Sequence, residues 1–146
     1  MSPVEVTVTN DQGGSIFVDG AGSVTVNPGI VGVAAGFGDH QKMVLFFDND
    51  SSNHQLHVAG SGAQPGDTFS LVLANIERFT KRSVEFLGAP TGEDANAFLD
   101  LELDPDLMIL QVDEDGDGEY EQSLIPYLIH EAPTTRIRRP RARLQP

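Results

Sequence analysis

The stretch Val4-Glu5-Val6-Thr7-Val8-Thr9 alternates valine with a polar residue from one end to the other. A period of two predicts a β-strand with one buried face, because successive side chains of a strand point to opposite sides. Turn-forming residues follow at once in Asn10-Asp11-Gln12-Gly13-Gly14. The chain therefore begins with the pattern of a short strand that ends in a tight turn.

Short runs of the same kind recur along the whole chain, separated by turn residues. Strands are expected at 15–19, 23–27, 30–38, 42–47, 54–59, 69–75, 83–87, 99–103, 107–112 and 122–129. The run 42–47 is continuously apolar, which predicts a strand buried on both faces with 54–59 as its hairpin partner. This spacing predicts an all-β fold, an antiparallel β-sandwich of the Ig-like or Greek-key/jelly-roll-like kind, with no helix required.

The C-terminal end differs from the rest of the chain in composition. Residues 132–146 are rich in Pro and Arg, with no period that would bury a face. The expected organisation is a β-sandwich domain at 1–131 and a disordered tail or linker at 132–146.

The charge is strongly negative, at −13, with 22 acidic and nine basic residues. Five of the nine basic residues lie in the tail: Arg136, Arg138, Arg139, Arg141 and Arg143. The body is expected to repel nucleic acid and anionic membranes and to attract cations. The tail is interpreted as a linker, with electrostatic contact to an anionic partner through Arg136 to Arg143 as the alternative.

The residue inventory excludes several classes of site. There is no cysteine, so disulfides and thiolate metal sites are excluded. No apolar run approaches the roughly 20 residues that span a bilayer, so membrane insertion is not expected. The first residues lack the pattern of a secretory signal, which leaves an intracellular protein or a piece of a longer secreted precursor as the two interpretations.

The acidic stretch Asp113-Glu114-Asp115-Gly116-Asp117-Gly118-Glu119-Tyr120-Glu121 matches the pattern D-x-D-x-D-G-x-x-E. Calcium takes six to eight oxygen ligands, which carboxylates at alternate positions of a curled loop can supply. The expected ligands are the side chains of Asp113, Asp115, Asp117 and Glu121 and the backbone carbonyl of Glu119. Gly118 permits the sharp turn.

Leu124 stands where a helical EF-hand needs a glutamate, and neither flank has helical spacing, so the loop is not an EF-hand. The simpler alternative is a solvated acidic turn without an ion. A second loop, 48–53, also has oxygen ligands at alternate positions but lacks the glycine and the downstream acid. A turn is favoured there over a second ion site.

On these residues the loop resembles the calcium loops of integrin-type propellers and, more distantly, of dockerins. From Leu73 to Tyr127 the order of features also resembles the terminal β-sandwich modules of large secreted or surface-anchored bacterial and archaeal proteins. The resemblance rests on the strand 107–112, the acidic loop and the segment Ser123-Leu124-Ile125-Pro126. It implies a non-catalytic accessory module outside the cell.

The expected function is therefore a non-catalytic, calcium-stabilised structural or adhesive module of an extracellular protein, with an unknown protein or glycan at a cell surface as its partner. No catalytic motif is present, and His54 and His57 are expected on opposite faces of one strand, at surface or edge positions. The first alternative is a carbohydrate-binding module, against which stand the absence of Trp and the interpretation of most Phe residues as core. The second is a hydrolase domain using Asp100, Glu102 and Asp104.

Overall fold

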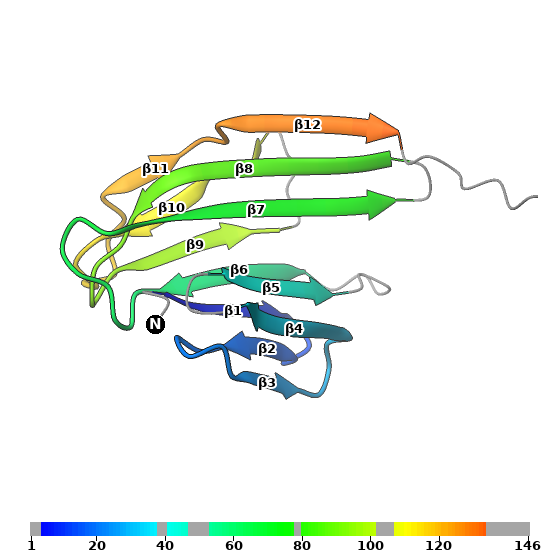
Figure 1. Ribbon diagram of the computed structural model, residues 1–146, viewed down its shortest axis with the longest axis horizontal. Helices are drawn as coiled ribbons and strands as arrows, with labels where there is room; N and C mark the ends of the chain where they lie inside the picture. The colour runs from blue at the N-terminus through cyan, green and yellow to red at the C-terminus, as the bar shows by residue number, and fades with distance from the viewer. Residues whose placement is uncertain (1–3, 38–40, 47–52, 78–79, 102–106, 134–146) are drawn as a thin grey trace, which may run out of the picture.

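The computed structural model describes residues 4–37, 41–46, 53–77, 80–101 and 107–133. Within these ranges the chain forms antiparallel β-strands and no α-helix, and the sheets pack together in two layers (Figure 1). The predicted all-β sandwich is confirmed. No helix among the described residues has the length and apolar character needed to cross a membrane.

One layer is a seven-stranded sheet with the order β11-β10-β9-β6-β1-β2-β3. Its strands are β1 (Glu5–Asn10), β2 (Ser15–Val18), β3 (Val24–Asn27), β6 (His54–Ala59), β9 (Asn96–Asp100), β10 (Leu110–Asp113) and β11 (Gln122–Leu124). The sheet therefore contains strands from both the N-terminal and the C-terminal part of the described chain. The N-terminal strands β2 and β3 lie at one edge, and the late strands β10 and β11 lie at the other.

The other layer consists of two smaller sheets. Three strands pair in the order β12-β8-β7, and two form the pair β4-β5. Their bounds are β4 (Gly32–Phe37), β5 (Gln41–Phe46), β7 (Thr68–Glu77), β8 (Thr80–Pro90) and β12 (Leu128–Pro133). In Figure 1 β7 and β8 pass across β10, β4 and β5 pass across β1 and β6, and β12 lies beside β8.

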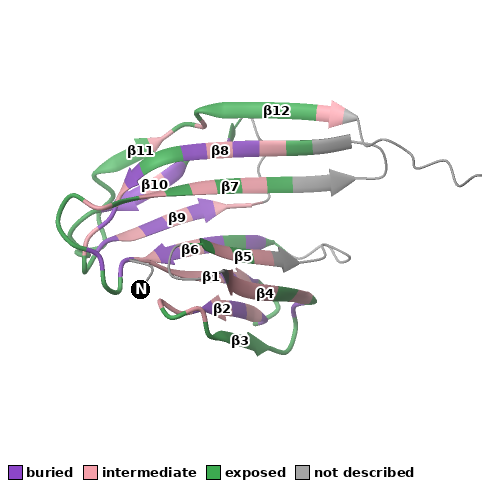
Figure 2. Cartoon of the chain, viewed as in Figure 1, coloured by how far each residue is buried: buried purple, intermediate pink, exposed green. Residues whose placement is uncertain are grey.

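The core lies between the layers and is built by alternation along the strands. Leu56 and Leu99 from the large sheet and Val84 and Phe86 from β8 belong to one buried cluster, and each is at most 4% exposed. The buried positions alternate with less buried ones along β6, β8 and β9 (Figure 2). Apolar burial of this kind is the main favourable term in folding.

Two sequence-based expectations about the middle of the chain are wrong. The strand at 54–59 does not pair with β5, because β6 lies between β1 and β9, while β5 pairs with β4. Nor is β5 buried on both faces, since Met43 is 41% exposed. Here β5 belongs to a two-stranded sheet at the side of the second layer, where one of its faces meets solvent.

The expected single strand at 122–129 is also wrong. The structure divides it into β11, which pairs with β10, and β12, which pairs with β8 of the other layer. Pro126 lies between the two strands and has no backbone N–H for a ladder hydrogen bond. The chain therefore changes layers here, and β12 continues to Pro133.

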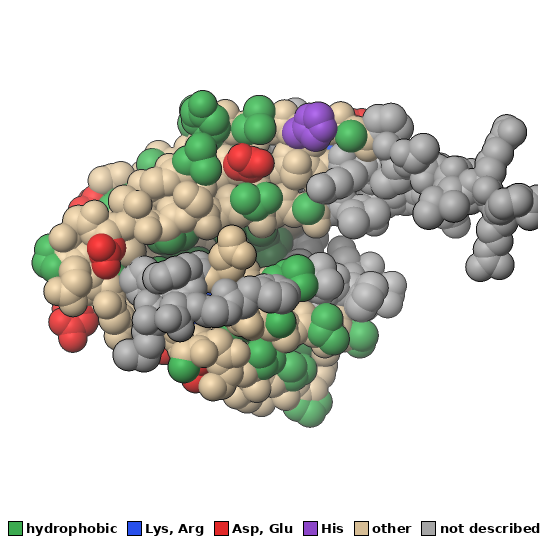
Figure 3. Space-filling view, viewed as in Figure 1, with side chains coloured by type: hydrophobic (Ala, Val, Ile, Leu, Met, Phe, Trp, Pro, Cys, Tyr) green, Lys and Arg blue, Asp and Glu red, His purple; other side chains and the backbone are tan. Residues whose placement is uncertain are grey.

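The outer face of the three-stranded sheet carries exposed apolar side chains. Val72 and Leu128 lie in register with Glu85 from either side, and Leu87 is 48% exposed on the same strand as Glu85. Hydrophobic side chains are seen gathered around β8 and β12 in the space-filling view (Figure 3).

Candidate metal centre

The acidic loop connects β10 and β11 and closes the hairpin that they form. Val112 lies opposite Gln122 in the register of this hairpin, so the loop begins and ends at neighbouring backbone positions. Asp113 is the last residue of β10 and lies opposite Asn96 of β9. The first predicted ligand is therefore anchored in the sheet, and the others follow it along the loop.

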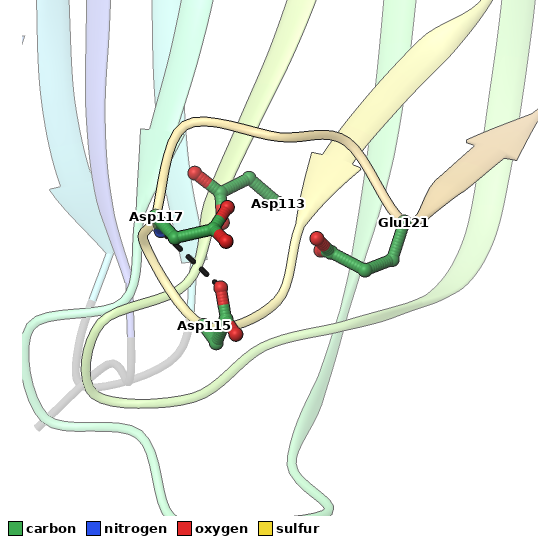
Figure 4. A group of neighbouring side chains, drawn as sticks. All are labelled: Asp113, Asp115, Asp117 and Glu121. Carbon is green, nitrogen blue, oxygen red and sulfur yellow. Dashed lines mark hydrogen bonds between the residues drawn. The ribbon is translucent and has the colours of Figure 1, made fainter.

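Four of the predicted ligand residues converge. One carboxylate oxygen from each of Asp113, Asp115, Asp117 and Glu121 lies within 4.8 Å of all the others. Figure 4 shows the three aspartates grouped inside the curl of the loop, with Glu121 approaching from the β11 side. Asp113 is buried, and the other three are exposed. The cluster is thus open to solvent on one side and able to hold a metal ion.

Backbone amides shape the curl by donating to the aspartates. The amides of Gly116 and Gly118 donate to the two oxygens of Asp113 at 2.6 and 3.0 Å. The Asp117 amide donates to Asp115 at 3.2 Å, and the Glu119 amide donates to Asp117 at 2.8 Å. Each bond spans a few residues, so the loop winds around its own carboxylates.

The two sides of the hairpin are also joined across the loop. The backbone amide of Glu114 donates to the carboxylate of Glu121 at 2.7 Å, and the Gln122 side chain donates to the carboxylate of Glu114. Glu121 is therefore directed toward the start of the loop.

Two glycines adopt backbone conformations that other residues rarely take. Gly118 has φ of 92°, as the predicted sharp turn requires, and Gly116 has φ of 77°. The importance of Gly116 was missed from the sequence. A Cβ there would lie 2.7 Å from the backbone oxygen of Asp94, in the loop between β8 and β9. The signal available in the sequence was the first glycine of the Asp115-Gly116-Asp117-Gly118 run, which comes in addition to Gly118.

Replacing Gly116 by alanine is expected to lower the free energy of unfolding by about 2 to 3 kcal/mol, because left-handed strain adds to a clash with Asp94. The matched variant Gly118→Ala introduces the left-handed backbone strain without a clash, because a Cβ there meets nothing within 4 Å. It is expected to lower the free energy of unfolding by about 1 kcal/mol. Urea unfolding in EDTA measures both. Equal losses would show that the contact between the two loops does not constrain the hairpin.

The remaining sequence candidates have mixed outcomes. Glu119 is exposed, and its role as a carbonyl ligand stays a prediction. The residues Asp48 to Ser52 of the second candidate loop, and Glu102 and Asp104 of the candidate catalytic face, lie outside the described residues. So do the arginines of the tail, Arg136 to Arg143.

The two histidines of β6 do lie on opposite faces, as expected. His54 is nevertheless buried at 2% exposure, so its prediction as a surface or edge residue is wrong. The physical reason is that β6 is a central strand, whose inward face meets the core. His57 lies on the outer face, where its Nε2 is 3.1 Å from Oδ1 of Asn96.

Comparison of the sequence with known protein families found no matching family model, and comparisons with curated proteins and with solved structures found no significant match.

Proposed function

We propose that this protein is a non-catalytic, calcium-stabilised structural or adhesive module that works outside the cell. The observation that carries the proposal is the convergence of Asp113, Asp115, Asp117 and Glu121 on one point of the β10–β11 hairpin. Four carboxylates this close repel one another, and a divalent cation relieves the repulsion.

The chemistry and size of the cluster favour calcium over other metals. All its side-chain donors are carboxylate oxygens, whereas zinc and copper prefer nitrogen or sulfur. Magnesium is usually bound through one or two carboxylates and keeps several waters, whereas calcium takes six to eight oxygen ligands, so four converging carboxylates suit calcium better. The four oxygens lie within 4.8 Å of one another, close enough to contact one ion together.

The position of the cluster suggests a structural role for the ion. β11 has three residues and forms the edge of the seven-stranded sheet, where Leu124 packs against the core. A cation held between Asp113 at the end of β10 and Glu121 just before β11 would fasten this edge strand. The chain then passes to β12, so the ion would stabilise the point where the two layers are joined.

An exposed loop site of this kind suits a location where calcium is always abundant. Calcium sites in extracellular modules have dissociation constants of about 0.1 to 1 mM, so they stay occupied outside cells. The resemblance of the loop and of the segment before Pro126 to secreted accessory modules points the same way. The proposed partner is a protein or glycan at a cell surface.

Calcium at about 5 mM is expected to stabilise the protein by about 1 to 2.3 kcal/mol relative to EDTA, if the dissociation constant lies in the range above. Calorimetry measures the melting temperature in both conditions. Asp115→Ala and Asp117→Ala should each remove the gain while leaving the calcium-free melt nearly unchanged, because both side chains are exposed.

Glu93→Ala is the matched control, since Glu93 is an exposed carboxylate outside the cluster, in the neighbouring loop. It should keep the full calcium effect. A melt that calcium leaves unchanged in the unmodified protein would contradict the proposal, and an equal gain with magnesium would contradict the choice of ion.

A further inference from the structure

The outer face of the seven-stranded sheet carries a continuous row of side chains that runs across the strands. Cross-strand registers connect each member to the next, from β2 to β10: Phe17, Thr7, His57, Phe98 and Gln111. The row extends to exposed residues on the edge strands, Thr25 of β3 and Ser123 of β11. Seven strands spaced by about 4.8 Å give it a length of about 29 Å.

The two phenylalanines of this row point away from the core. Phe17 lies between the fully buried Ile16 and Val18, and Phe98 lies between Ala97 and Leu99, which are 1% and 0% exposed. Because side chains alternate along a strand, both aromatic rings belong to the outer face, where they are partly exposed. Phe17 and Phe98 are therefore exceptions to the interpretation of most Phe residues as core.

The side chains around the rings are neutral or acidic hydrogen-bonding groups. Gln55 lies in register with Thr9 on one side and Asp100 on the other, in the row next to the aromatic one. Glu5 belongs to the row on the opposite side. None of the strands in the seven-stranded sheet contains Lys or Arg.

His57, between the two rings in the row, is held in place by its neighbour. Its Nε2 lies 3.1 Å from Oδ1 of Asn96, and Nδ2 of Asn96 donates to the backbone oxygen of Asp94 at 3.0 Å. Asp94 is the residue that a Cβ on Gly116 would meet. The centre of the face is thus preorganised by the loop that supports the candidate metal centre.

We infer that this outer face binds a neutral oligosaccharide laid across the strands, with sugar rings stacked on Phe17 and Phe98. A sugar ring offers C–H groups to the negative face of an aromatic ring and hydroxyls to the amides and carboxylates around it. Aromatic walls with a few well-placed polar groups are typical of small-molecule sites.

The negative charge around the row favours a neutral saccharide over an anionic ligand or a second copy of this chain. The row is flanked by the carboxylates of Glu5 and Asp100, and the described strands of its own sheet carry no cation. Lys42 of β5 interacts electrostatically with both Glu5 and Asp19, so two acids oppose this one cation at that end of the row. Phosphate, sulfate and uronate groups would therefore be repelled. A second copy of this chain would present the same acidic face and would also be repelled. A neutral saccharide carries no such penalty.

Isothermal titration with cellohexaose, xylohexaose and chitohexaose tests the inference, with trigalacturonate as the anionic comparison. At least one neutral hexasaccharide should bind the unmodified protein, and trigalacturonate should not. Phe17→Ala and Phe98→Ala should each weaken binding about tenfold or more through lost stacking. Gln55→Ala should weaken it as well, and because Gln55 is exposed this variant leaves the packing of the sheet intact.

Leu87→Ala is the matched control, since it removes an exposed apolar side chain from the other layer, and it should bind like the unmodified protein. The inference is overturned if no neutral hexasaccharide binds, if trigalacturonate alone binds, or if Leu87→Ala weakens binding as much as Phe98→Ala does. A dimer in sedimentation experiments that Phe98→Ala dissociates would identify a second copy as the occupant and would equally overturn it. The calcium proposal has a separate readout in the melting temperature, so either can fail alone.

Discussion

Replacing Asp113 by alanine is expected to destabilise the protein by about 2 to 4 kcal/mol even when no calcium is present. Both oxygens of this carboxylate accept backbone amides, from Gly116 at 2.6 Å and from Gly118 at 3.0 Å. Hydrogen bonds to a charged acceptor are worth about 1.5 to 3 kcal/mol each, and the partial access of these amides to water lowers the total. Asp113 is also 4% exposed, so alanine leaves space that neighbouring groups must fill.

Urea unfolding in EDTA measures this loss without any contribution from the metal. Asp115→Ala is the comparison, because that side chain is exposed and accepts one amide at 3.2 Å, so its loss should stay below about 1 kcal/mol. The two variants should then differ in EDTA and agree in failing to gain stability from calcium. Equal losses in EDTA would show that Asp113 acts only as a metal ligand and not as the organising residue of the loop.

Replacing Phe86 by alanine is expected to cost about 3 to 5 kcal/mol, the range found for large aromatic residues in cores. Phe86 is 1% exposed, lies opposite Leu71 of β7, and belongs to the cluster between the layers. For a chain of this size, each kcal/mol lowers the melting temperature by about 3 to 4 °C, so a fall of about 10 to 20 °C is expected in calorimetry.

Two variants check that this effect comes from the position and not from the residue type. Leu87→Ala changes the adjacent residue, which is 48% exposed on the outer face, and should cost less than about 1 kcal/mol. Phe98→Ala removes the same type of side chain from a partly exposed site, and its loss of stability should lie between those of Leu87→Ala and Phe86→Ala. Phe86 is assigned to the core between the layers and Phe98 to the outer face of the seven-stranded sheet. Equal losses of stability for Phe98→Ala and Phe86→Ala would contradict this assignment.

Features that depend on neighbours in the chain could be predicted from the sequence. The strand at 4–9 follows from its own period of two, and the structure has it as β1. The acidic loop likewise follows from spacing, because carboxylates at alternate positions of a curled loop can point toward the same centre. Its carboxylates therefore converge where the sequence placed them.

Features that depend on which strands meet could not be predicted in this way. Ser15 to Val18 has apolar residues at 16, 17 and 18, so alternation alone does not say whether Phe17 or its neighbours face the core. The answer depends on the sheet that covers Ile16 and Val18. The same holds for His54, whose burial follows from the central place of β6.

The sequence by itself determined the all-β class, most strand positions and the four acidic residues of the loop, because all of these depend on residues a few positions apart. Tertiary structure alone decided that β6 joins β1 and β9, that the chain changes layers near Pro126, and that Phe17 and Phe98 lie outside. Pairing between distant strands depends on the packing of the whole core, and a local pattern of side chains fits several partners equally well.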